Sequence, residues 1–252
     1  MLVLLPPSET KRDGGGPTPF AHDALSFPSL RDTRTEAIRA TIDLAADADA
    51  MMRALKLGPR QAAEIERNRN LATSPTMAAI DRYTGVLYDA LDAPSLDAAA
   101  RRYAAEHVAV HSALLGLVGA GDPIPAYRLS HDSRLPGLRL KAHWRDAVAA
   151  VLASRDGVII DLRSEGYVGL GPAPARADSV FLRVVSVDAD GRRRALNHFN
   201  KRAKGLFTRA LLESRPVLEG RDDLIAWAEG AGFRLDLGVE RATLPAELEL
   251  VA

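Results

Sequence analysis

The chain has 252 residues, of which 47% are hydrophobic and 26% charged, a composition that allows a large buried core. It contains no cysteine, which excludes disulfides, thiolate metal sites and a cysteine nucleophile and fits a reducing compartment. The 33 basic residues balance the 33 acidic ones, so the chain is not a globally basic nucleic-acid binder and any polyanion site must be local.

The chain begins with a short apolar run, Met1–Leu5, that is closed by two prolines. The run lacks a basic segment before it and is shorter than a signal peptide requires. No other stretch is long and apolar enough to cross a bilayer. We therefore expect a buried strand at Met1–Leu5, a cytoplasmic location and no membrane partner.

The first half of the remaining chain favours helices and loops. Glycines and prolines predict a loop over Ser8–Pro19, and Ser95 is a plausible cap for the last of the helices. The segments with helical or turn character are Asp32–Met52, Gly58–Asn70, Pro75–Ile80, the turn Asp81–Tyr88 and Leu96–Glu106.

The second half adds most of the strands. Strands are predicted at Val108–His111, Gly157–Leu162 and Ser179–Val187, with a return strand at Ala195–His198 after the turn Asp188–Gly191. The residues 123–136 are irregular, and helices are expected over Trp144–Leu152 and Lys201–Ser214. Strands and helices in mixed order, without repeats or long linkers, predict one α+β (mixed α/β) domain over residues 1–252, with a mixed sheet flanked by helices.

Polar residues follow two of the predicted strands. Open α/β sheets bind ligands at the carboxyl ends of their strands, so these positions are candidates for chemistry. Serine, lysine, tyrosine and carboxylates there can act as nucleophile, cation and general acid or base. The alternative is an ordinary polar loop and a set of helix caps. The catalytic candidates are Ser8, Glu9, Lys11, Asp161, Glu165 and Tyr167.

The segment Leu115–Asp122 is rich in glycine and resembles the turn of a helix–hairpin–helix element. In such a turn Gly116, Gly119 and Gly121 let the backbone approach a phosphate. No Lys-Ser/Thr pair follows, so it is not a P-loop, and a plain glycine-rich connection is an equal alternative. Tyr127 and Arg128 then form an aromatic and cationic pair, in which Arg128 can bind a phosphate or a carboxylate. The alternative is that Arg128 is a surface arginine paired with a nearby acidic residue.

Positive charge is concentrated near one helix. Between Arg192 and Arg209 the chain has seven basic residues and no acidic one. Helical periodicity groups Lys201, Arg202, Lys204 and Arg209, which suits a run of phosphates, and a plain solvated face is an equal alternative. The six histidines have no metal-ligand spacing, so we expect neither a metal nor a cofactor.

Several segments together resemble the YaaA-type peroxide stress proteins. The resemblance runs in order across nearly the whole chain and is carried by Leu4–Lys11, Tyr83–Tyr88, Ser112–Leu117, Pro125–Leu129, Trp144, Val158–Tyr167 and Asn200–Arg209. It implies a cytosolic protein that protects against hydrogen peroxide, partly by limiting intracellular iron. It also implies a positively charged cleft and a helix–hairpin–helix element that bind DNA.

Two departures from the family pattern reduce positive charge. Val118–Asp122 replaces a family Leu-Arg-Pro-Leu-Asp, and Ser8-Glu9-Thr10 replaces Ala-Lys-Thr, with a lysine only at Lys11. We therefore keep three hypotheses: a DNA-binding stress protein without sequence specificity, an enzyme for a small nucleobase-like or phosphorylated substrate, and a scaffold for a partner. The enzyme hypothesis requires the loops at Ser8, Tyr127, Ser164 and Lys201 to meet.

Overall fold

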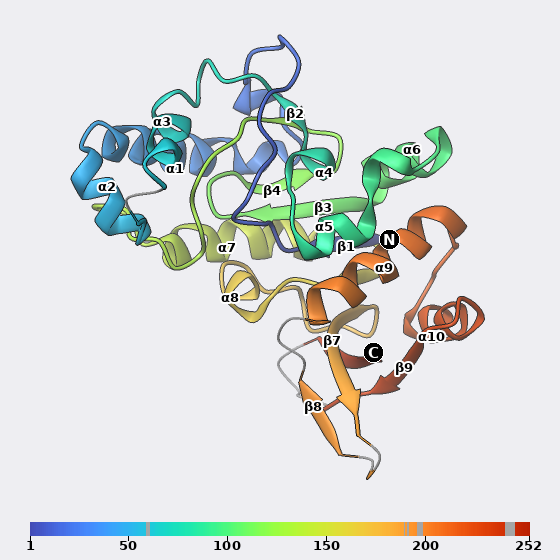
Figure 1. Cartoon of the computed structure of the whole chain (residues 1–252). Helices are drawn as coiled ribbons and strands as arrows, with labels where there is room; N and C mark the ends of the chain where they lie inside the picture. Colours follow the sequence, from blue (N-terminus) through green and yellow to red (C-terminus); the bar gives the residue numbers. More distant parts are fainter. Residues whose placement is uncertain (59–60, 189, 191, 196–198, 240–244) are drawn as a thin grey trace.

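A computed structural model describes residues 1–58, 61–188, 190, 192–195, 199–239 and 245–252. Its main sheet has eight strands in the order β4-β3-β1-β6-β7-β10-β9, with β8 paired to β7 (Figure 1). Strands β3, β1, β6, β7 and β10 run parallel, whereas β4, β8 and β9 are antiparallel to their neighbours. The bounds are β1 Leu2–Leu5, β3 Val108–Ser112, β4 Gly116–Gly119, β6 Ile159–Asp161, β7 Ser179–Val187, β8 Arg193–Ala195, β9 Arg234–Leu237 and β10 Ala246–Val251.

Helices surround this sheet, and a second sheet pairs β2 (Met77–Ala78) with β5 (Pro123–Ile124). The predicted mixed α/β fold is confirmed. The helices are α1 Arg31–Ala45, α2 Ala48–Leu55, α3 Ala63–Arg69, α4 Ala79–Arg82, α5 Val86–Leu91, α6 Ala98–His107, α7 Leu140–Ala153, α8 Glu165–Val168, α9 Phe199–Ser214 and α10 Arg221–Gly230, with short 3-10 turns at His22–Ala24, Pro28–Leu30 and Ala93–Ser95.

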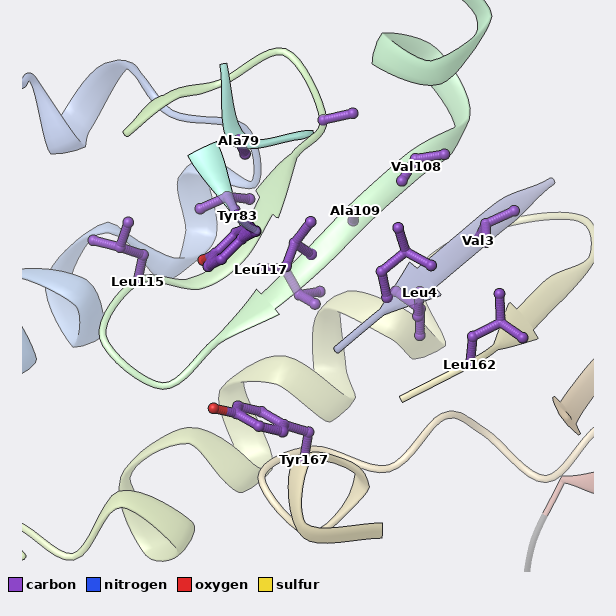
Figure 2. Packing of buried hydrophobic residues seen from close by; sticks show 14 of the residues in the cluster. Val3, Leu4, Ala79, Tyr83, Val108, Ala109, Leu115, Leu117, Leu162 and Tyr167 are labelled. Atoms are coloured by element: carbon purple, nitrogen blue, oxygen red, sulfur yellow. The ribbon is translucent and has the colours of Figure 1, made fainter. Parts of the chain in front are cut away.

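Strand β1 lies in the middle of the core. All four of its residues are buried, and Leu4 is paired with Ala109 of β3 on one side and Asp161 of β6 on the other. Figure 2 shows Val3 and Leu4 next to Val108 and Ala109. A continuous apolar run is what a parallel strand covered on both faces needs. The predicted strand at Met1–Leu5 is therefore confirmed.

Two local predictions about the helices are wrong. The predicted helix Asp32–Met52 is two helices, because Asp47 accepts a hydrogen bond from the Ala50 amide and caps α2. Helix α6 is capped by Asp97, which binds the Ala100 amide at 2.7 Å, and not by Ser95. In both places an aspartate can cap the helix start, and the sequence pattern did not choose between neighbouring capping residues.

The segment Leu115–Asp122 is not a helix–hairpin–helix turn. Gly116–Gly119 form strand β4, which is buried and pairs antiparallel with β3. The Gly119 amide donates to Asp122 Oδ2 at 2.8 Å, so a carboxylate of the protein itself takes the amide that the prediction gave to a phosphate. Gly116 has a φ of 67°, and a Cβ there would lie 2.6 Å from the Trp144 ring. These glycines serve packing.

Three further segments differ from expectation. Met77–Ala78 is a strand before α4 begins at Ala79, and the predicted turn Asp81–Tyr88 contains the end of α4 and the start of α5. The return strand is β8 at Arg193–Ala195, and the residues 196–198 lie outside the described residues. The helix α10 and strands β9 and β10 follow Ser214, where the sequence analysis assigned no element.

The packing role of Gly116 predicts a large effect of Gly116→Ala. The methyl group would overlap the Trp144 ring in a left-handed backbone conformation, so the free energy of unfolding should fall by roughly 2–4 kcal/mol in urea denaturation. Gly121→Ala is the matched control, because its Cβ would lie 3.6 Å from that of Ala105, and should change stability by less than about 0.5 kcal/mol. Equal effects of the two changes would contradict this account.

Candidate functional site

The carboxyl ends of three neighbouring parallel strands bring the polar segments together. Strand β1 is paired in parallel with β3 and β6, so the three strands end at the same edge of the sheet. Their last residues are Leu5, Ser112 and Asp161, and the segments that follow lie at this edge. This is the edge where open α/β sheets bind ligands. The polar residues there form two neighbouring groups, which we name by their lysines, Lys11 and Lys204.

Lys11 is the centre of the first group. Its side chain is buried, and Nζ donates to the Ser8 carbonyl at 2.9 Å and to the Glu9 carbonyl at 3.2 Å. The amine also lies 4.0 Å from the ring centroid of Tyr127, a cation–π contact. Burial, helped by the neighbouring Arg128 guanidinium, lowers the pKa of Lys11 from 10.5 to about 7. The amine can therefore gain or lose a proton near neutral pH.

A chain of hydroxyl groups passes beneath Lys11. The Tyr127 hydroxyl lies 2.7 Å from that of Tyr83 and 2.7 Å from Ser112 Oγ. Ser112 Oγ also accepts hydrogen bonds from the amides of Leu114 and Leu115, which fixes it at the end of β3. Burial raises the pKa of Tyr127 to about 12, so its hydroxyl stays protonated at neutral pH. The chain links the end of β3 to Tyr83, which forms an isolated β-bridge with Lys11.

Arginines flank Lys11 on its more exposed side. Arg128 pairs with Glu9 at 2.5 Å, and its backbone amide and carbonyl both bind the buried side chain of Asn68. Arg67 pairs with Glu64 at 2.7 Å and with Asp13 at 2.6 Å. The predicted residues Ser8, Glu9, Lys11, Tyr127 and Arg128 therefore do come together.

The end of β6 carries a buried ion pair in place of a free carboxylate. Asp161 accepts two hydrogen bonds from the Arg163 guanidinium, at 2.8 and 2.6 Å. Arg163 also donates to His111 Nδ1 at 2.7 Å and to the Gly171 carbonyl at 2.9 Å. Burial and Arg163 lower the pKa of His111 well below its usual value, so His111 is neutral. Asp161 thus balances Arg163, a role that the sequence analysis did not consider.

Tyr167 lies between the two groups. Its ring packs edge-on against His111 and His131, with centroids 5.9 and 5.1 Å apart. Burial raises the pKa of Tyr167, and the nearby carboxylate of Glu9 contributes to this increase. The hydroxyl is therefore a neutral hydrogen-bonding group between the Lys11 group and the end of β6.

Lys204 lies beside residues that line a small cavity, although it does not line the cavity itself. Lys204 is buried with its Nζ 3.5 Å from the Arg163 carbonyl, and burial lowers its pKa to about 8. Arg183 pairs with Glu247 at 2.9 Å and with Glu165 at 3.0 Å. A cavity of about 140 Å³ is lined by these two glutamates, Arg183, Asp161, Phe181 and three apolar residues.

The other cations predicted on α9 differ in their surroundings. Arg209 donates to the carbonyls of Leu91 and Asp92 at 3.0 and 3.1 Å and pairs with Glu213 at 2.8 Å, so it binds the end of α5. Lys201 and Arg202 are exposed on α9. Among the described residues, Lys204 is the cation of this helix that contacts the segment after β6.

Four residues of the site were missed by the sequence analysis as functional positions: Tyr83, Ser112, Arg163 and Arg67. The first three lie in segments that carry the family resemblance, which was the available signal, but nothing local marked Arg163 as a buried arginine. Nothing in the sequence singled out Arg67. Among the residues that the structure describes, no group of three or more histidine or acidic side chains could hold a metal ion. No helix in this part of the chain is long and apolar enough to cross a membrane.

The buried Lys11 predicts a specific pH dependence of stability. Between pH 7 and 10.5 the unfolded chain keeps a proton on Lys11 that the folded chain has released. The free energy of unfolding therefore rises with pH in this range. The free energy of unfolding of the wild type relative to Lys11→Met should increase by roughly 2 kcal/mol between pH 6.5 and 9 in urea denaturation. Lys141→Met, an exposed control, should show a constant difference. A constant difference for Lys11→Met would contradict the lowered pKa.

Comparison with known proteins agrees with the resemblance. A family model described as "Peroxide stress protein YaaA" matches residues 1–236. A UPF0246 protein of Corynebacterium glutamicum is 42% identical over 238 residues, which are 92% of this chain and 94% of the relative. A UPF0246 protein of Streptomyces coelicolor is 40% identical over 244 residues, 94% of this chain and 92% of the relative. The chain therefore belongs to the YaaA family of peroxide stress proteins.

Proposed function

We propose that this chain protects cells against peroxide stress and that its working part is a small-molecule site around Lys11. The family description supports the physiological role. The geometry supports the site, because loops that follow β1 and β6 meet the Tyr127–Arg128 segment at one edge of the sheet. Glu9 binds Arg128 at 2.5 Å, and the charge of Glu9 contributes to the raised pKa of Tyr167.

The observation that carries this proposal is the buried position of the Lys11 amine, between two backbone carbonyls and the Tyr127 ring. An amine with a pKa of about 7 can take a proton from a bound molecule or give one to it at neutral pH. Its rotation is limited by two carbonyl acceptors and the Tyr127 ring, so the amine is already positioned. A tyrosine ring and an arginine side by side, as at Tyr127 and Arg128, can bind a nucleobase-like or phosphorylated molecule. Lys11 is then the general acid or base, and Arg128 binds the ligand's anionic group.

This proposal predicts that Lys11→Met abolishes protection. Cells that lack their own copy of the gene and express the Lys11→Met variant should survive hydrogen peroxide no better than cells without the protein. Cells that express Lys141→Met should survive like those with the wild type, because Lys141 is exposed on α7. Immunoblots show equal amounts of protein, and intracellular iron is measured in the same cultures. Full protection by an equally abundant Lys11→Met variant would refute the role of Lys11.

DNA binding without sequence specificity is a second candidate, supported by the start of α9. Lys201 and Arg202 are exposed there, and neither pairs with a carboxylate in the described part of the chain. Gly116 and Gly119 are buried in β4, so this candidate depends on α9 and on Gly121, which is exposed. Two adjacent free cations suit backbone phosphates, which carry no sequence information.

The DNA candidate is tested by charge reversal. Lys201→Glu with Arg202→Glu should weaken binding to duplex and single-stranded DNA, because two phosphate contacts are lost. The slope of log affinity against log salt concentration should become shallower by up to about 2. Lys141→Glu with Arg145→Glu changes the net charge equally on α7 and should have a smaller effect. Equal effects of the two double variants would show that only net charge matters.

A further inference from the structure

The loop after β1 supplies carboxylates to arginines that belong to other segments. Glu9 binds Arg128 at 2.5 Å, and Asp13 binds Arg67 at 2.6 Å. The partners in each pair differ strongly in exposure. The side chains of Glu9 and Asp13 are 61% and 80% exposed, whereas those of Arg128 and Arg67 are 14% and 23% exposed. The two acids therefore cover guanidinium groups that are set into the protein.

The arginines are fixed by the scaffold. The buried side chain of Asn68 accepts from the Arg128 amide at 2.8 Å and donates to the Arg128 carbonyl at 2.7 Å. Arg67 precedes Asn68 on α3 and is held by Glu64 as well as by Asp13. Asn68 therefore fixes the backbone of Arg128, and Glu64 holds the Arg67 guanidinium independently of Asp13. The acids are the replaceable half of each pair.

Lys11 completes a group of three cations. It lies on the same loop between Glu9 and Asp13, and its amine is 4.0 Å from the ring centroid of Tyr127, the neighbour of Arg128. Arg67 precedes Asn68, whose side chain binds the Arg128 backbone, so the three cations come from adjoining segments. Glu64, which pairs with Arg67, is the carboxylate that stays with this group when Glu9 and Asp13 leave. Two guanidinium forks and an amine are the donors that phosphate groups prefer, because forks bind two oxygens at once. An ion pair with an exposed partner contributes little to the free energy of folding. The Glu9–Arg128 and Asp13–Arg67 pairs can therefore separate with little loss of stability.

We propose that Lys11, Arg67 and Arg128 form a seat for a small multivalent anion of the phosphate or diphosphate class, and that Glu9 and Asp13 occupy this seat until such an anion displaces them. The inference rests on the proposed small-molecule site and adds its ligand class and its regulation. Glu9, a catalytic candidate in the sequence analysis, becomes a competitor of the ligand. While Glu9 and Asp13 are bound to the arginines, weakly charged molecules do not displace them. An anion that binds all three cations does.

The test measures binding of inorganic phosphate and of pyrophosphate by calorimetry at pH 7. Glu9→Gln with Asp13→Asn removes the competing charges, so pyrophosphate affinity should rise roughly 5- to 20-fold. Arg67→Gln with Arg128→Gln should lower it by at least about tenfold. Glu66→Gln is the matched control, because Glu66 forms an exposed pair with Arg69 on the same helix, and it should leave the affinity unchanged. Thermal unfolding confirms that each variant is folded.

Three outcomes overturn the inference: no binding of either anion to the wild type or the Glu9→Gln, Asp13→Asn variant, no gain in that variant, or an equal gain in Glu66→Gln. Pyrophosphate binding that is much tighter than phosphate binding supports a diphosphate ligand, and equal binding supports a single phosphate group. Peroxide survival with Lys11→Met is a separate readout. If the Lys11→Met variant fails to protect and the anion affinities do not change as stated, the proposed small-molecule site is supported and the proposed competition by Glu9 and Asp13 is refuted.

Discussion

The parallel pairing of β1 between β3 and β6 is the constraint on which the site depends. Because three parallel strands end at one edge, Lys11, Ser112 and Arg163 lie near one another although they are far apart in the sequence. The pairing is stabilised by burial of the whole of β1, and each large apolar side chain there contributes about 1.5–3 kcal/mol. The polar edge thus rests on an entirely apolar strand.

Buried cations in this protein are satisfied mainly by backbone carbonyls. Arg34 donates to the carbonyls of Leu115, His22, Ser26 and Leu117, and Arg82 donates to those of Ile124, Arg12, Gly14 and Pro75. Lys11 uses the same kind of partner. A buried charge is tolerated only when its hydrogen-bonding capacity is filled, and carbonyls fill it without adding an opposite charge. Positive charge in this chain therefore joins segments as well as facing solvent.

This use of cations explains why charge counted along the sequence gave an incomplete picture of the site. The run from Arg192 to Arg209 divides in the structure: Arg193 pairs with Asp236 and Glu249, Arg209 binds the end of α5, and Lys204 enters the core. Lys201 and Arg202 are left exposed. Both partners of Arg193 come from β9 and β10, because β10 pairs with β7, the strand that also pairs with β8.

The sequence alone determined the mixed α/β class, the family, the central strand and the polar segments after β1 and β6, because apolar runs, glycine and proline positions and ordered motifs are local signals. Only the tertiary structure decided which polar residues meet. It placed Gly116–Gly119 in a buried strand against Trp144, which is distant in the sequence. It also placed Tyr83 and Ser112 against Tyr127. These contacts depend on long-range packing, which no short window of residues encodes. The pairs Gly119–Asp122 and Asp161–Arg163 are close in the sequence, but their role follows from burial, which the local pattern does not show.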